Sequence, residues 1–95
     1  MTANYRKEKA KKLEEKKKAA LRKVEREFNE DIKNAHQLYK GMRNDVDKDD
    51  KRYKTKIADL NAKQKDVVKT YEKGKKDAIK AVEEEFKIKI RNIKV

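Results

Sequence analysis

Apolar side chains recur every three or four residues along most of this 95-residue chain. The first stripe of this kind comprises Leu21, Val24, Phe28, Ile32, Ala35, Leu38, Tyr39 and Met42. Such spacing places its members on one face of an α-helix. The chain has no proline, and the intervening positions are rich in Lys, Glu, Ala and Arg, which all favour helices. The pattern therefore predicts an all-α chain.

A second stripe follows residue 50 and has the alternating four- and three-residue spacing of a coiled coil. It comprises Tyr53, Ile57, Leu60, Gln64, Val67 and Tyr71, with the polar Gln64 at one position of the seam. Near Ala78 the frame shifts by one residue. The continuation, which we call the C-terminal stripe, comprises Ile79, Val82, Phe86, Ile90 and Ile93. We therefore expect coiled-coil-like packing between two helices.

Gly41 lies at the end of the first stripe. Glycine readily adopts the left-handed conformation that ends many helices, so Gly41 is predicted to cap the first helix. Four aspartates follow it: Asp45, Asp47, Asp49 and Asp50. The first two could cap the next helix, and the last two would stand in its first turn, where negative charge is favourable. We predict a long antiparallel helical hairpin in one domain, 1–95, with helices over about 3–40 and about 48–93 and a loop over about 41–47.

Two other arrangements compete with the hairpin. Glycine inside a helix costs only about 1 kcal/mol, so the chain could form one continuous helix that dimerises in parallel. A three-helix bundle bent at Gly74 is the other alternative. In the hairpin, a turn near residue 45 would pair residues 13–35 with 53–75. The C-terminal stripe would then face residues 1–13, which offer few apolar side chains. We therefore expect this stripe to be poorly covered, and the chain to form a homo-oligomer through it or to dock there on a partner protein.

The charge of the chain is high and unevenly distributed. It has 30 Lys and Arg against 18 Asp and Glu, a net charge of +12. Residues 1–24 and 51–76 each carry a net +7, whereas residues 25–50 carry −3. Two basic arms that flank an acidic middle would attract polyanions such as nucleic acids. Lys, with 24 residues, outnumbers Arg, with 6, so contacts would fall mainly on phosphates with little choice of base sequence.

The candidate nucleic-acid contacts are basic residues of the two arms: Lys7, Lys11, Lys12, Lys18, Arg22, Lys51, Arg52, Lys56, Lys63 and Lys65. Tyr5 stands among lysines and away from both stripes, so it is the tyrosine best suited to stack on a base. Solvation is the competing explanation, since pairs such as Asp50–Lys54 and Glu85–Lys89 have the i,i+4 spacing that stabilises a helix. These pairs leave a surplus of Lys unexplained.

Residues suited to catalysis or metal binding are scarce. The chain has no Cys and no Ser, and His36 is its one histidine. Residues 45–49 resemble the start of a calcium-binding loop, but Asp50 occupies the position of the required glycine and Lys56 that of the required glutamate. We therefore expect no enzymatic activity, no cofactor and no metal site.

Composition also limits the cellular setting. Leu, Ile, Val and Phe make up 18 of the 95 residues, which together with the net charge brings the chain close to the composition of disordered proteins. No apolar run is long enough to span a membrane, and the narrow apolar faces lack the Trp that favours lying on one. We expect a soluble intracellular protein, in the cytoplasm or inside a virion, with no membrane partner.

The leading hypothesis is a non-enzymatic basic helical accessory protein that binds nucleic acid or a ribonucleoprotein through phosphate contacts. The alternative is a protein–protein interaction module, such as an assembly, scaffold or inhibitor coiled coil, that acts through the C-terminal stripe. In general character the chain resembles the small Lys/Glu-rich helical accessory proteins of phages and mobile elements, including virion-internal and anti-defence proteins. That resemblance rests on no motif and implies no role for a particular residue.

Overall fold

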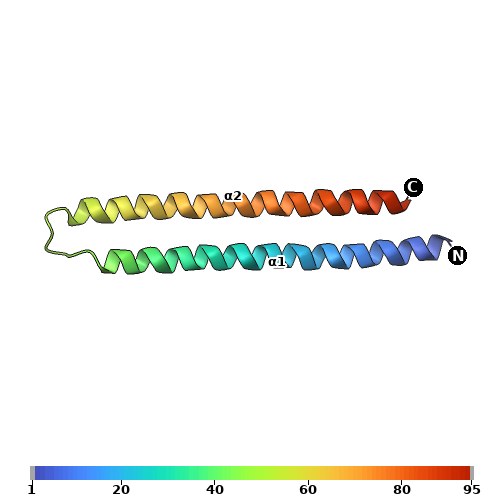
Figure 1. The fold of residues 1–95 in the computed structure, drawn as a ribbon, viewed down its shortest axis with the longest axis horizontal. Coiled ribbons are helices and arrows are strands. Elements are labelled where there is room, and N and C mark those ends of the chain that lie inside the picture. The colour runs from blue at the N-terminus through green and yellow to red at the C-terminus, as the bar shows by residue number, and fades with distance from the viewer. Residues whose placement is uncertain (1, 95) are drawn as a thin grey trace. The chain divides into compact units, whose positions relative to one another are not determined.

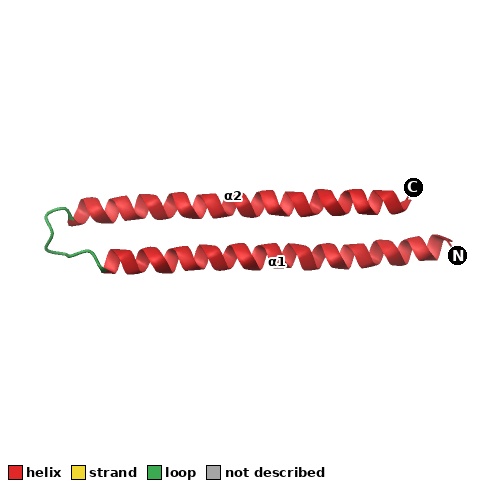
Figure 2. Ribbon diagram, viewed as in Figure 1, coloured by secondary structure: helices red, strands yellow, loops and turns green. Residues whose placement is uncertain are grey.

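The computed structural model of the chain describes residues 2–94 (Figure 1). Helix α1 spans Thr2–Asn44, helix α2 spans Tyr53–Lys94, and residues 45–52 form the loop between them (Figure 2). The described residues contain no strand, and neither helix is long and apolar enough to cross a lipid bilayer. The predictions of an all-α chain and of two helices joined by a loop are confirmed. The alternative of one continuous helix is wrong.

The loop lies later in the chain than the predicted 41–47, because α1 continues through Gly41. Gly41 has no positive φ, so the prediction that it caps α1 is wrong. One glycine costs a helix only about 1 kcal/mol. Arg43, in the next turn, donates hydrogen bonds from its guanidinium to Asn61 Oδ1 at 3.4 Å and to Gln64 Oε1 on α2. These contacts with the partner helix favour the additional turn.

The aspartates of the loop hold its backbone in turns. Asp47 Oδ1 accepts a hydrogen bond from the N–H of Asp49 at 2.9 Å, and Asp50 Oδ1 accepts one from the N–H of Arg52 at 2.7 Å. Such local bonds compete with helix formation. Helix α2 consequently begins at Tyr53 and has no acidic residue in its first turn. The predicted start near residue 48, with aspartates as cap and first turn, is therefore wrong.

The chain divides into two compact units. The terminal unit consists of residues 1–26 and 75–95, and the loop unit consists of residues 27–74. Each unit contains one segment of α1 and one segment of α2, and the two segments lie side by side in opposite directions. Antiparallel pairing of the helices is therefore present in both units.

In the loop unit, Phe28 of α1 packs over Gly74 of α2. A Cβ atom placed on Gly74 would lie only 3.0 Å from Cε1 of the Phe28 ring. Nearer the loop, Gln64 of α2 hydrogen-bonds to His36 of α1. Helix α2 continues unbroken through Gly74, so the alternative of a bundle bent at this residue is wrong. Gly74 therefore does not end α2; it leaves room for the Phe28 ring of α1.

In the terminal unit, the C-terminal stripe of α2 lies opposite a later part of α1 than predicted. Glu14 and Lys17 of α1 line one open groove together with Lys87 and Ile90 of α2. At Ile90 the stripe therefore faces residues beyond 13, because the loop lies later in the chain than predicted, whereas Ile93 still lies beside Leu13. Phe86 is only 7% exposed, so the expectation that it is poorly covered is wrong.

The apolar seam between the helices is thin. Ala35 in the loop unit and Phe86 in the terminal unit are the buried apolar residues among those described, each 7% exposed. No described side chain is less than 2% exposed. The remaining members of the C-terminal stripe are half-buried. Each unit is consequently held by few apolar contacts, and single substitutions in the seam should have measurable effects.

Gly41→Ala and Gly74→Ala form a matched pair that tests the Phe28 contact. Each replaces a helical glycine by alanine, a change worth about 0.5–1 kcal/mol of stability. Nothing lies within 4 Å of a Cβ on Gly41, so Gly41→Ala is expected to deliver this gain. Gly74→Ala should deliver clearly less, because the Phe28 ring must move away. Urea unfolding followed by circular dichroism measures both.

A Phe28→Leu background supplies the control for this pair. Gly74→Ala should gain more stability there than in the wild type, since the atoms nearest to the new Cβ are absent. Equal gains at the two glycines in the wild-type background would contradict the packing of Phe28 over Gly74.

Candidate nucleic-acid interface

Pairing of the helix segments concentrates positive charge in the terminal unit. This unit has 18 Lys and Arg against 8 Asp and Glu, a net charge of +10. The loop unit has 12 against 10, a net charge of +2. Nearly all of the charge surplus of the chain therefore belongs to the terminal unit.

The two basic arms consequently have different surroundings. The first arm, residues 1–24, pairs with residues 75–95, which are themselves net +3. Most of the second arm lies in the loop unit, where residues 27–50 have a net charge of −3 that comes from the aspartates of the loop, since the α1 segment 27–44 is neutral. The positive charge of the second arm is thus offset in large part within its own unit, and that of the first arm is not.

Four candidate residues lie on one face of α1, and we call them the basic stripe: Lys7, Lys11, Lys18 and Arg22. All four are exposed, and none forms an ion pair within the described residues. Glu14, four residues before Lys18, shares this face and lines an open groove with Lys87 and Arg91 of α2. The basic stripe therefore lies on the same side of the helix pair as these two bases.

Sequence reasoning missed Lys87 and Arg91 as site residues. Residues 77–95 have a net charge of only +1, so the segment did not stand out as basic. Their i,i+4 spacing is the signal that could have indicated a shared basic face. Their position beside the basic stripe depends on the register of the two helices. Counting charges along the sequence gives no information on that register.

Lys12 is exposed but belongs to a different face of α1. There it lines a second open groove with Tyr5, Lys9 and Lys16. Lys9 Nζ lies 5.5 Å from the centroid of the Tyr5 ring, in a cation–π contact. Tyr5 is 63% exposed, which leaves its ring accessible to a ligand. The structure thus separates Lys12 from the basic stripe and places it near Tyr5.

The candidates of the second arm are exposed and lie in the loop unit: Lys51, Arg52, Lys56, Lys63 and Lys65. Lys56 and Lys63 line an open groove whose other charged residues are aspartates. Lys65 lines a separate groove that includes Glu72. Carboxylates beside these bases compete with phosphates for their charge, so they are weaker candidates than the basic stripe.

Asp50 is the clearest example of this compensation. Its Oδ2 atom accepts a hydrogen bond from Lys56 Nζ at 2.6 Å, an ion pair that replaces the expected pairing with Lys54. This bond, followed by the one from the N–H of Arg52, holds the pKa of Asp50 below its ordinary value of 3.8. Of the i,i+4 pairs expected from the sequence, Glu85–Lys89 is formed at 2.9 Å.

Gln64, the polar seam residue expected from the sequence, links the two helices of the loop unit. Its Oε1 atom accepts a hydrogen bond from the Arg43 guanidinium, and its Nε2 donates to His36 Nδ1 at 2.5 Å. The described residues contain no group of three or more His, Asp or Glu suited to a metal ion. His36 is exposed, and its hydrogen bond to Gln64 joins α1 to α2 in the loop unit.

The C-terminal stripe, proposed from the sequence as a protein interface, is partly covered. Phe86 is buried, and the other members are half-buried: Ile79, Val82, Ile90 and Ile93. The most exposed large apolar side chains are Tyr5 at 63%, Leu38 at 61%, and Met42 and Ile88 at 43% each. Leu38 and Met42 stand four residues apart on one face of α1. They are better placed than Phe86 to contact another molecule.

The lowered pKa of Asp50 predicts a loss of stability in acid. A carboxyl group with a lowered pKa in the folded protein stabilises the fold above its unfolded pKa, near 3.8, and this contribution is lost as the pH falls through the folded value. Lys56→Gln removes the first cause of the shift, so the pKa of Asp50 should rise toward 3.8 in this variant. Titration of the Asp50 carboxyl carbon by NMR measures the midpoint directly.

Lys54→Gln is the matched control for this titration, because Lys54 forms no ion pair with Asp50. It should leave the Asp50 midpoint close to that of the wild type. Equal midpoints in the wild type and Lys56→Gln would contradict the ion pair.

The comparisons with known proteins give no assignment for this surface. No protein-family model, curated protein or solved structure matches the chain. The charge, exposure and geometry of the residues described above are therefore the basis for a functional proposal.

Proposed function

We propose that the chain is a non-enzymatic protein that binds nucleic acid, or a ribonucleoprotein, through phosphate contacts made by its terminal unit. The observation that carries this proposal is the net charge of +10 in that unit against +2 in the loop unit. Such a surplus in about half of the chain creates a field that attracts polyanions and speeds their association. Solvation alone would not require the charge to be concentrated in one unit.

The basic stripe is the surface best suited to a phosphate backbone. Its members extend from Lys7 to Arg22 of α1, a separation of 15 residues or about 22 Å at a rise of about 1.5 Å per residue. Lys87 and Arg91 add two further cations on the same side of the helix pair. With about six phosphates of duplex DNA neutralised, the slope of log affinity against log salt would be near −5.

Binding of this kind has little dependence on base sequence. Three of the four stripe residues are Lys, and Lys presents a point charge without the planar fork with which Arg reads guanine. Phosphate contacts fix the position of a nucleic acid and carry no sequence information. The proposed partner is therefore defined by its charge density, and structured RNA and duplex DNA would both qualify.

Neutralisation of the basic stripe tests the proposal. The quadruple variant Lys7→Gln, Lys11→Gln, Lys18→Gln and Arg22→Gln removes four charges from one face of the terminal unit. Because each lost phosphate contact removes about 0.9 from the salt slope, the slope on duplex DNA should become shallower by about 3 to 4. Fluorescence anisotropy with a labelled duplex across a salt series, with nuclease-treated protein, measures the slope.

The matched control removes four exposed Lys of the loop unit instead: Lys33→Gln, Lys40→Gln, Lys48→Gln and Lys54→Gln. Both variants have the same net charge, so a difference between them reports where the nucleic acid binds. The control should keep most of the wild-type slope. Equal losses in the two variants would mean that binding follows net charge alone, and absence of binding at low salt would overturn the proposal.

A second candidate function, assembly through protein contacts, is favoured by the exposure of Leu38 and Met42. With one buried apolar side chain in each unit, the described residues bury little apolar surface, and small domains of this kind often gain stability by oligomerisation. We propose that the chain self-associates through these two side chains, with the C-terminal stripe retained inside the terminal unit. An interaction module of this kind could exist with or without nucleic-acid binding.

The double variant Leu38→Glu and Met42→Glu is expected to lower the mass of the protein in sedimentation equilibrium, because like charges would meet at the proposed contact. Ile88→Glu is the control, since Ile88 has the same exposed fraction as Met42 but lies in the terminal unit. Phe86→Asp would place a charge at a buried position and should reduce helicity instead. A monomeric wild type, or an unchanged mass in the double variant, would exclude this contact.

A further inference from the structure

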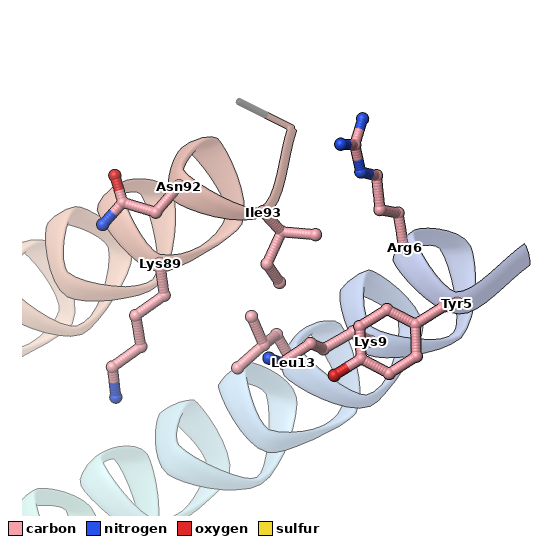
Figure 3. A pocket seen from close by; sticks show the side chains of 7 residues that line it. All are labelled: Tyr5, Arg6, Lys9, Leu13, Lys89, Asn92 and Ile93. Carbon is pink, nitrogen blue, oxygen red and sulfur yellow. The ribbon is translucent and has the colours of Figure 1, made fainter. Parts of the chain in front are cut away.

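An open hollow lies at the ends of the two helices in the terminal unit (Figure 3). It is lined by Tyr5, Arg6, Lys9 and Leu13 of α1 and by Lys89 and Ile93 of α2. Lys9 precedes Lys18 of the basic stripe by nine residues, or two and a half helical turns, so the two point from opposite sides of α1. The hollow is therefore separate from the surface proposed above for the phosphate backbone.

The hollow combines an accessible aromatic ring with an apolar floor. Leu13 and Ile93 point toward each other between the two helices (Figure 3). The Tyr5 side chain beside them is 63% exposed, more than Leu38, Met42 or Ile88. Lys9 Nζ lies 5.5 Å from its centroid. A flat, unsaturated ligand could stack on this ring, with the Lys9 ammonium close enough to contact an attached anion.

Further cations continue from Tyr5 along α1. Lys9, Lys12 and Lys16 follow it at intervals of four, three and four residues, and all line the adjoining open groove, where they outnumber its carboxylate, Glu8. This row spans about 16 Å from Tyr5 to Lys16 at about 1.5 Å per residue. Lys89 contributes less, because its Nζ pairs with Glu85 at 2.9 Å and lies 5.0 Å from the centroid of the Phe86 ring. The row of Lys on α1 is thus the main anion-binding part of this face.

We infer that this face binds single-stranded nucleic acid: an unpaired base stacks on Tyr5, and the phosphates that follow it lie along Lys9, Lys12 and Lys16. An aromatic platform beside a basic groove is the combination that single-strand binding uses, and stacking tolerates any base because every base has a π-face. The bases of a duplex are already stacked on one another and cannot lie flat on an exposed side chain. The inference rests on the proposed function for its partner class, but it assigns a different face and different residues.

Two probes of equal charge test the stacking step. One is oligothymidylate of about 12 nucleotides, and the other is an abasic oligonucleotide of the same length. Stacking of a base is worth about 1–3 kcal/mol, and one exposed ring should give the lower part of that range. The wild type should therefore bind oligothymidylate about five- to tenfold more tightly than the abasic strand. In Tyr5→Ala this ratio should fall to about one, while Tyr5→Phe should keep it.

Duplex DNA and Ile88→Ala supply the controls. Tyr5→Ala should leave the affinity and salt slope for the duplex unchanged, because Tyr5 lies away from the basic stripe. Ile88→Ala removes another exposed apolar side chain of the terminal unit and should keep the preference for oligothymidylate. Circular dichroism of each variant checks that helicity is retained.

The outcomes separate this inference from the proposed function. A wild type that binds the duplex with a steep salt slope but binds both oligonucleotides equally would overturn the Tyr5 site alone. Retention of the oligothymidylate preference in Tyr5→Ala would do the same. A wild type that binds no nucleic acid at low salt would overturn both proposals together.

Discussion

In each unit a thin apolar seam holds the two helix segments together, and this constraint shapes the rest of the molecule. Ala35 and Phe86 are the buried apolar residues among those described, one in each unit. Because so narrow a seam buries little apolar surface, it contributes little free energy of folding. The few close contacts therefore decide which residues of the two helices meet. In the loop unit, Phe28 fits over Gly74 because the glycine has no Cβ. Helices paired in this way leave most of their circumference to solvent, and charged residues occupy it.

Polar contacts add specificity that the thin seam cannot supply by itself. Gln64 bonds to Arg43 and to His36, so one side chain of α2 meets two side chains of α1 spaced seven residues apart. A shift of register by one helical turn would break both bonds. Polar residues in the seams of coiled coils fix the register in this way. The aspartates of the loop act similarly at short range, since Asp47 and Asp50 each accept a backbone N–H two residues ahead. Their charge is then also available to balance the bases of the second arm.

The sequence predicted the elements of this fold well and their register poorly. Apolar periodicity and the absence of proline suffice to predict two helices, because both are local properties of the chain. The end of α1 depends on Arg43, whose partners on α2 lie 18 and 21 residues away, so the local signal of Gly41 was misleading. The site was affected in the same way. Lys56 has an i,i+6 partner in Asp50 that no helical spacing rule would suggest, and Lys87 gains its importance only from the segment of α1 opposite it.

The charge of the terminal unit opposes its own folding, and this is an argument for a ligand. Lys7 with Lys11, Lys12 with Lys16, and Lys18 with Arg22 are like charges at i,i+4, and each such pair destabilises a helix by about 0.2–0.5 kcal/mol. Residues 75–95, also net positive, add to the repulsion across the seam. In the loop unit, by contrast, the α1 segment is neutral overall, and the aspartates of the loop offset much of the positive charge of α2. A polyanion on the terminal unit would remove the repulsion and stabilise the folded form by mass action, so binding and stability are coupled in this unit.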